Sequence, residues 1–185
     1  MPTAYVYFGK IINPDTVTAA VMGCRTLIGD KNDQGHPAWD NLKFEIASTG
    51  GDVAPAFALY NELNSLPLQI DTHNAGAVDS AAIMPFMAGT RRTASANSAF
   101  LFHQLSWTFA GPSTLTVVND ARRWLETYEG MMADVVSSKT KLKKDEILRM
   151  MHVGTTLSPA DAKKVGLIDA VEEYKIPFNA RTYQV

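Results

Sequence analysis

The stretch "LKFEIASTGGDVAPAFALYNEL", residues 42–63, decides the fold class of this chain. Residues 42–48 alternate between apolar and polar side chains, which is typical of a β-strand, and the segment ending at Gly50 and Gly51 stops that strand. Residues 53–65 then carry apolar side chains at helical spacing. A strand, a glycine turn and a helix in this order indicate an α/β protein.

The remaining sequence continues the alternation of strands and helices. Further strands are predicted at 4–8, 68–73, 92–95, 99–103 and 167–171. Helices are predicted from Pro14 to about Leu27 and at 80–89, 114–137 and 158–166, with a charged link at 139–151 leading into another short helix and a long surface loop at 29–41. The order predicts mostly parallel strand pairing, and residues 1–185 are expected to form a single domain.

Two helix ends carry recognisable signals. Asn13 followed by Pro14 is a good N-cap with proline at the first helical position. Ser158 with Asp161 three residues later is a capping signature, and Gly166 suits the end of the same helix. The long helix at 114–137 has an apolar stripe, part of which is expected to face a neighbouring subunit.

Composition excludes several classes of function. The net charge of -2 and the pI of about 6.1 give no reason to expect a nucleic-acid partner. The single cysteine, Cys24, lies on an apolar helix face, which favours buried packing and a reducing compartment. No signal peptide or spanning segment is visible, so we expect a cytoplasmic protein without a membrane partner. No Cys/His cluster has metal-ligand spacing, and no metal or cofactor is expected.

Three features have the chemistry of a catalytic site, although each also has a purely structural explanation. Gly50 and Gly51 leave backbone N–H groups free to hold an oxyanion, or serve only as a turn with positive φ. Ser80 follows a short Gly-Ala turn at a helix start, with the N–H of Ala81 beside it, or is an ordinary N-cap. His103 ends an apolar strand and can act as a general base near neutral pH, or is a structural histidine.

Successive segments of the sequence resemble the Clp protease proteolytic subunit (ClpP) family of serine peptidases, within the larger crotonase-like superfamily. They are "STGGDV" (48–53), "GAVDSAAIMPFMAG" (76–89), "FLFHQ" (100–104) and "LSPADAKKVGLID" (157–169), and the resemblance extends over about residues 5 to 172. It implies a ClpP/crotonase-like fold of repeated β-β-α units with a long helix packing on the sheet.

The resemblance also implies a site and its partners. Ser80 would be the nucleophile and His103 the general base, and the N–H groups of Gly51 and Ala81 would form the oxyanion hole. A serine-type endopeptidase of this kind cleaves peptides or unfolded polypeptides through an acyl-enzyme, without a cofactor, inside a homo-oligomeric ring. The small residues around Ser80 would keep the site open for a peptide backbone.

The sequence departs from the family pattern at three places. The family's aspartate that orients the histidine would fall at Gly154, and residues 152–156 contain no carboxylate. Asp79 replaces a small neutral residue before the nucleophile, and its side chain is expected to serve as a surface or capping carboxylate unless it reaches the site. The chain begins almost at the first strand, without the family's axial segment, so an ATPase unfoldase partner is not implied.

These departures leave alternative interpretations open. An acid from elsewhere, such as Asp120 or Asp134, would orient His103 only if the fold brings it there. Without such an acid, the chain would be a catalytically inactive ring subunit of the same family. A crotonase-like acyl-CoA enzyme is a third hypothesis, against which the pairing of Ser80 with His103 argues.

Overall fold

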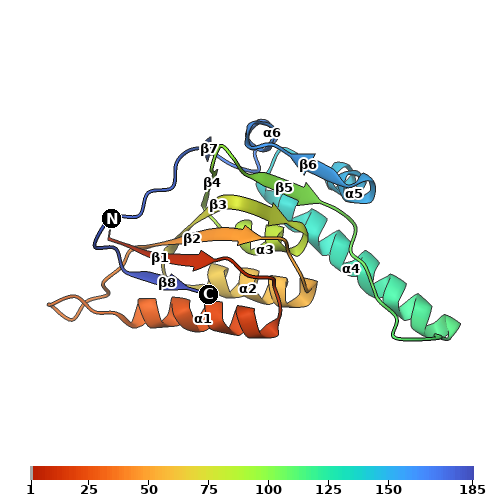
Figure 1. The fold of residues 1–185 in the computed structure, drawn as a ribbon, viewed down its shortest axis with the longest axis horizontal. Coiled ribbons are helices and arrows are strands. Elements are labelled where there is room, and N and C mark those ends of the chain that lie inside the picture. The colour runs from red at the N-terminus through yellow and green to blue at the C-terminus, as the bar shows by residue number, and fades with distance from the viewer. Residues whose placement is uncertain (1) are drawn as a thin grey trace.

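The computed structural model describes residues 2–185, which form a mixed α/β structure (Figure 1). The strands are β1 (Thr3–Phe8), β2 (Asn41–Ser48), β3 (Gln69–Asp79), β4 (Arg91–Ala94), β5 (Ala99–Phe102), β6 (Thr155–Leu157), β7 (Ala170–Val171) and β8 (Thr182–Gln184). The helices are α1 (Pro14–Gly29), α2 (Val53–Ser65), the short 3₁₀ turn η1 (Ser80–Ala82), α3 (Ile83–Phe86), α4 (Leu115–Lys139), α5 (Lys144–Val153) and α6 (Pro159–Lys164).

The strands form one sheet in the order β6-β5-β3-β2-β1-β8, with β4 pairing to β3 and β7. Every pair is parallel except β5 with β6. The expected α/β class and mostly parallel pairing are therefore confirmed. Parallel strands end at the same edge of a sheet, so the ends of β2 and β3 come together where the glycine turn and Ser80 follow them.

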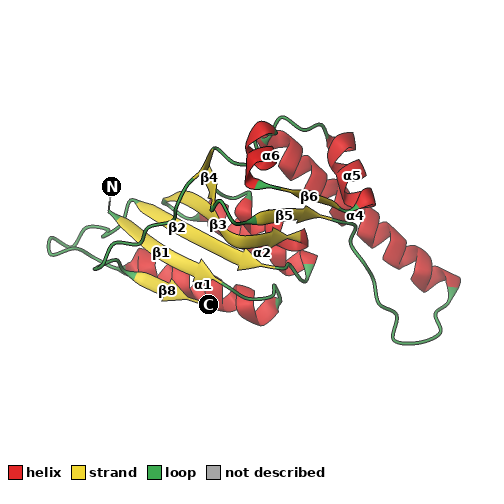
Figure 2. Ribbon diagram, turned by 45° about the horizontal axis from the view of Figure 1, so that its top comes forward, coloured by secondary structure: helices red, strands yellow, loops and turns green. Residues whose placement is uncertain are grey.

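Helices α1 and α2 lie side by side against one face of the sheet, and α4 extends obliquely past its end (Figures 1 and 2). The buried core between sheet and helices is aliphatic and aromatic, with Phe8 stacked on Phe44 and Phe86 packed edge-on against Phe100. Figure 2 shows the loop between β5 and α4 reaching away from the sheet together with the start of α4. None of the helices in residues 2–185 combines the length and apolar composition needed to cross a bilayer.

The predicted helix ends are confirmed. Asn13 accepts a hydrogen bond from the backbone N–H of Thr16, whose hydroxyl accepts one from the backbone N–H of Asn13 in return. Ser158 accepts from the N–H of Asp161, and Gly166 follows α6 with φ at 77°. Cys24 is fully buried, and this burial raises its thiol pKa to about 12, so packing is its observed role.

Around β3, one expectation was wrong and another was confirmed only in part. The strand predicted at 68–73 continues to Asp79, so no Gly-Ala turn separates it from Ser80. It continues because β3 changes partner, pairing with β4 over residues 71–74 and with β5 over residues 77–79. The helix predicted at 80–89 consists only of η1 and α3, since the Thr72 hydroxyl donates to the carbonyl of Phe86 and Thr90 donates to β3.

Near the C-terminus, the strand predicted at 167–171 is reduced to β7. Leu167 and Ile168 are buried and donate to the carbonyl of Ala162 in α6, which takes them out of the sheet. Strands β6 and β8 were not predicted. β8 pairs with the outer edge of β1, and this contact depends on tertiary structure that a three-residue strand does not reveal in sequence.

Candidate active site

Ser80 occupies a strained turn at the end of β3. Its φ is 55°, and it is the one residue other than glycine in the described chain with a positive φ. Such a backbone costs about 1–3 kcal/mol and persists only where the surroundings enforce it. A serine in a sharp strand-to-helix turn presents its hydroxyl at the edge of the sheet, which is the geometry of a nucleophile elbow. The N-cap interpretation of Ser80 is therefore replaced by a strained turn.

Gly50 allows the end of β2 to approach this turn. A Cβ at Gly50 would lie 2.7 Å from the carbonyl oxygen of Asp79 and 2.8 Å from the Cβ of Ser80. Its φ of 91° is also in the region that favours glycine. The glycine therefore serves both the turn and the close approach to Ser80.

Gly51 is held in place by the segment that follows β1. A parallel bridge joins it to Ile12, in which Ile12 donates to the carbonyl of Gly50 and accepts from the N–H of Asp52. The N–H of Gly51 itself therefore points away from Ile12. The Ala81 nitrogen lies 3.1 Å from the position of a Cβ at Gly50, and the first N–H groups of a helical turn lack helical partners. These two donors can hold an oxyanion beside Ser80.

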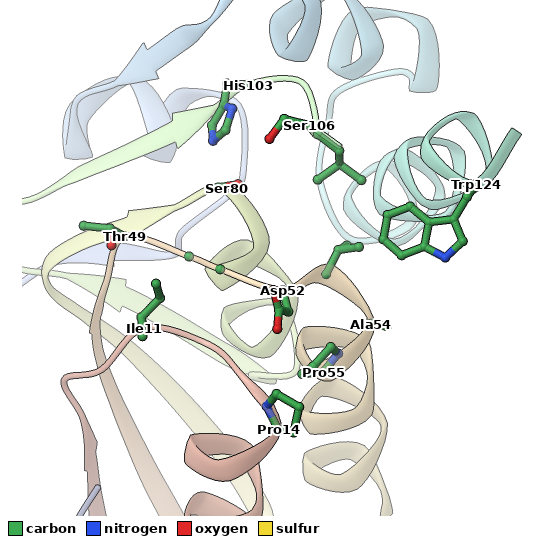
Figure 3. Close-up of a pocket in the computed structure, with 14 residues that line it drawn as sticks. Ile11, Pro14, Thr49, Asp52, Ala54, Pro55, Ser80, His103, Ser106 and Trp124 are labelled. Carbon is green, nitrogen blue, oxygen red and sulfur yellow. The ribbon is translucent and has the colours of Figure 1, made fainter. Parts of the chain in front are cut away.

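His103 follows β5, and its ring points toward Ser80 (Figure 3). Among the described residues, no hydrogen bond joins its imidazole to the Ser80 hydroxyl; catalytic hydrogen bonds are often long until substrate binds. The segment after His103 is fixed to the long helix, because the N–H of Leu105 donates to the Glu129 carboxylate over 2.9 Å. This contact determines where the chain leaving His103 runs.

Ser80, His103 and Gly51 line one cavity of about 570 Å³ (Figure 3). The other lining residues are Ile11, Pro14, Thr49, Gly50, Asp52, Val53, Ala54, Pro55, Leu105, Ser106 and Trp124. Trp124 belongs to an aromatic series that runs through Tyr128 to Phe57 and so joins α4 to α2. The part of the lining formed by Leu105 and Trp124 is thus apolar.

Sequence reasoning missed most of this lining. Trp124 lies within the helix predicted at 114–137, whose apolar stripe was expected to face a neighbouring subunit, and Leu105 and Ser106 lie in a segment with no predicted structure. Their contribution depends on the path of the loop from β5 back to α4. The only signal in the sequence was a tryptophan within the predicted long helix, and its closeness to the site is visible only in the structure.

Gly154 sits next to His103 across the sheet. The antiparallel β5–β6 ladder pairs Phe102 with Thr155, so the next step along it brings Gly154 opposite His103. Gly154 ends α5 with φ at 73°, and a Cβ there would meet nothing within 4 Å. The position that lacks a carboxylate is therefore the one opposite His103 in the strand register.

The other acids that could orient His103 lie in different surroundings. Asp120 pairs with Arg123 on the exposed side of α4, and Asp134 pairs with Lys144 over 2.8 Å. Neither is a residue of the cavity. Asp79 does not line the cavity either, but it is half-buried at the end of β3, makes no side-chain capping hydrogen bond, and burial raises the pKa of its carboxyl. The expected capping role of Asp79 is therefore not found, and its side chain is half-buried rather than fully on the surface.

The remaining histidines are away from the cavity. His73 is buried and hydrogen-bonded to Thr93 and Ser95, and this burial lowers its pKa to about 4. His36 and His152 are exposed. No group of His, Cys, Asp and Glu side chains in residues 2–185 is arranged to hold a metal ion.

The family model and the two sequence relatives compared with this chain are all Clp protease proteins. The family model described as Clp protease matches residues 32–175. The ATP-dependent Clp protease proteolytic subunit of Deinococcus radiodurans is 30% identical over 132 residues, covering 70% of this chain and 64% of that protein. The chloroplastic proteolytic subunit 4 of Arabidopsis thaliana is 24% identical over 168 residues, covering 90% of this chain and 55% of that protein.

The fold also has a close structural counterpart. A solved structure of a ClpP1 mutant from Listeria monocytogenes superimposes with a TM-score of 0.77, at 18% identity, over 94% of this chain and 92% of that chain. At this identity the match establishes the fold. The chain spans less than two thirds of the length of the two relatives compared by sequence.

Proposed function

We propose, from the premise that the chain belongs to the Clp protease family, that it is a serine-type endopeptidase cleaving peptides or unfolded polypeptides. The observation that carries this proposal is the strained backbone of Ser80, with φ at 55°, at the edge of a cavity that His103 also lines. A protein that used Ser80 only for packing would gain nothing from the strain.

In this proposal the residues have the following roles. His103 takes the hydroxyl proton of Ser80 as the Ser80 oxygen attacks the peptide carbonyl carbon. The N–H groups of Gly51 and Ala81 hold the resulting oxyanion, and such donors each contribute roughly 3–4 kcal/mol in comparable enzymes. The proton passes to the leaving amine, and water then hydrolyses the ester on Ser80 in the same manner.

Labelling with a serine-directed fluorophosphonate tests this proposal directly. We expect stoichiometric labelling by intact mass, located at Ser80 rather than Ser106 by peptide mapping. Labelling should be lost in Ser80→Ala and reduced strongly in His103→Ala. A folded wild-type protein that reacts neither as a monomer nor as its largest oligomer would contradict the proposal.

A catalytically inactive ring subunit is the second candidate function, and the absence of a carboxylate at Gly154 favours it. The labelling experiment separates the two, since an inactive subunit would fold and assemble without reacting. A crotonase-like acyl-CoA enzyme would instead bind coenzyme A, which calorimetry measures without reference to Ser80.

We also propose assembly into a homo-oligomeric ring. Support comes from apolar side chains exposed along and beside the start of α4, among them Leu115 at 75% and Val118 at 42% exposed. Exposed apolar patches of this kind mark association surfaces. A closed ring would enclose the Ser80 sites and restrict access to unfolded chains.

A further inference from the structure

The last residue of β3 is Asp79, so a carboxylate directly precedes Ser80. Asp79 pairs with Leu101 in the parallel β3–β5 ladder, and His103 follows two residues after Leu101. Val78 and Phe100 are buried on the helix side of this ladder, whereas Asp79 and Leu101 are half-buried on the other face. His103 comes two residues after Leu101, just past the end of β5, so the alternation of the strand directs its side chain to the same face as that of Asp79.

The electrostatics agree with this geometry. Burial raises the pKa of Asp79, while a hydrogen bond with the backbone of Leu101 and the charge of His103 act in the opposite direction. Among the described residues, Asp79 forms no ion pair with a lysine or arginine. Its negative charge is therefore available to the imidazole.

Other carboxylates lie near His103: Asp52 lines the same cavity from the start of α2, and on α6, which packs on β5, Asp161 pairs with Lys164. Strand β6 contributes Thr155, Thr156 and Leu157, which carry no charge. On α4, Glu129 is engaged with the N–H of Leu105. His152 on α5 is exposed, and it is a base rather than an acid.

We infer that Asp79 is a positioning residue for His103, supplying from the β3 side the negative charge that Gly154 does not supply from the β6 side. This inference rests on the proposed function. As the Ser80 O–H bond breaks and the bond from its oxygen to the substrate carbonyl carbon forms, the proton moves to His103. Asp79 stays ionised and stabilises the imidazolium until the proton passes to the leaving nitrogen and the C–N bond breaks.

Substitution of Asp79 gives the first test. Asp79→Asn keeps the shape and removes the charge, Asp79→Glu keeps the charge, and Asp120→Asn removes an exposed charge as a matched control. We expect Asp79→Asn to lower the rate of Ser80 labelling and kcat for a peptide by about tenfold or more, with KM little changed. Asp79→Glu should retain more activity than Asp79→Asn, and Asp120→Asn should behave as wild type.

Rescue distinguishes an electrostatic role from a structural one. Adding Gly154→Asp to Asp79→Asn places a carboxylate on the other side of His103, and we expect it to restore at least half of the lost rate on a logarithmic scale. A merely structural Asp79 would not be rescued in this way. Labelling of Asp79→Asn within twofold of wild type would overturn the inference.

A second readout does not require activity. In Ser80→Ala protein, an NMR titration of the His103 ring should shift its midpoint to lower pH when Asp79→Asn is added, because the imidazolium loses a stabilising charge. An unchanged midpoint would overturn the inference even if labelling succeeds. An unlabelled wild type would instead overturn the proposed function, leaving the role of Asp79 to be decided by the titration alone.

Discussion

Gly154 lies across the β5–β6 ladder from His103, one step beyond the Phe102–Thr155 pair. The fold therefore keeps position 154 opposite His103 in register, although this sequence provides no side chain there. The space is open, since a Cβ at Gly154 would have no neighbour within 4 Å.

Gly154→Asp should consequently increase the rate at which Ser80 reacts. The left-handed φ of 73° costs stability for most residues, but aspartate and asparagine tolerate it best, at about 1 kcal/mol. Gly154→Asn is the matched control, with the same shape and no charge. We expect several-fold faster fluorophosphonate labelling for the aspartate variant alone, and a larger effect in the Asp79→Asn background. Equal rates for the two variants would show that charge at this position has no influence.

Gly50→Ala should disrupt the site through the contact with Ser80. The added methyl group would lie within 2.8 Å of both the Asp79 carbonyl and the Ser80 Cβ. Gly35→Ala is a matched control, because Gly35 has a similar positive φ of 78° but nothing within 4 Å of the added Cβ. Thermal unfolding should show a clearly lower Tm for Gly50→Ala than for Gly35→Ala, with loss of labelling only in the former. Similar Tm values would mean that φ strain alone determines the cost.

Stability should fall in mild acid because of His73. Its pKa is about 4 in the folded protein and about 6.5 when unfolded, so the unfolded state binds the proton first as pH falls. The free energy of unfolding should decrease by about 2 kcal/mol between pH 7 and pH 5 from this residue alone. Urea unfolding at both pH values measures it, and His73→Gln should reduce the difference while the exposed His152→Gln should not. A wild-type difference that persists in His73→Gln would assign the effect to other groups.

Glu129→Ala should weaken catalysis without removing a catalytic group. It deletes the acceptor for the Leu105 N–H and so loosens the segment that leaves His103. We expect kcat/KM for a peptide to fall by about three- to tenfold, or about 0.7–1.4 kcal/mol, which is less than the roughly 1.5–3 kcal/mol of one hydrogen bond to a charged group because the contact acts only indirectly on His103. Glu126→Ala, which removes an exposed carboxylate from the same helix, should leave kcat/KM unchanged. If Glu129→Ala and Glu126→Ala have the same kcat/KM, the hydrogen bond between Leu105 and Glu129 has no role in catalysis.

Leu115→Ser combined with Val118→Ser should shift the protein toward the 20.2 kDa monomer in sedimentation velocity. Both side chains are exposed, so the substitutions should leave the Tm of the monomer nearly unchanged. Val153→Ser, which removes another exposed apolar side chain from α5, is the control for a general loss of surface hydrophobicity. A wild-type protein that sediments as a monomer at working concentration would defeat the proposed ring.

The sequence predicted the parts of the fold that depend on local pattern. Alternation in β2, the spacing of apolar residues in α2 and α4, and the caps at Asn13 and Ser158 all follow from neighbours in the chain. The length of β3 did not follow, because residues 74–79 become a strand by exchanging one partner strand for another. β8 was missed because its three residues acquire a regular structure only at the edge of β1.

The candidate site shows the same division. Gly51, Ser80 and His103 were identified by motif resemblance, and the structure places all three on one cavity. Their catalytic roles stay predictions. The relation of Asp79 to His103 could not be derived, since it depends on the β3–β5 register rather than on any spacing within one segment. The position of Trp124 at the cavity likewise could not be predicted. It depends on the path of the loop between β5 and α4, which brings the long helix beside the site.

The hydrogen bond between Leu105 and Glu129 makes the surroundings of His103 and the long helix thermodynamically linked. In the proposed ring, a protomer that contacts the exposed end of α4 and a peptide that occupies the cavity would act on the same connected segment. If subunit contact favours one position of that segment, it changes peptide affinity by some factor, and peptide must change the subunit affinity by the same factor. Substrate would then promote assembly as strongly as assembly promotes substrate binding.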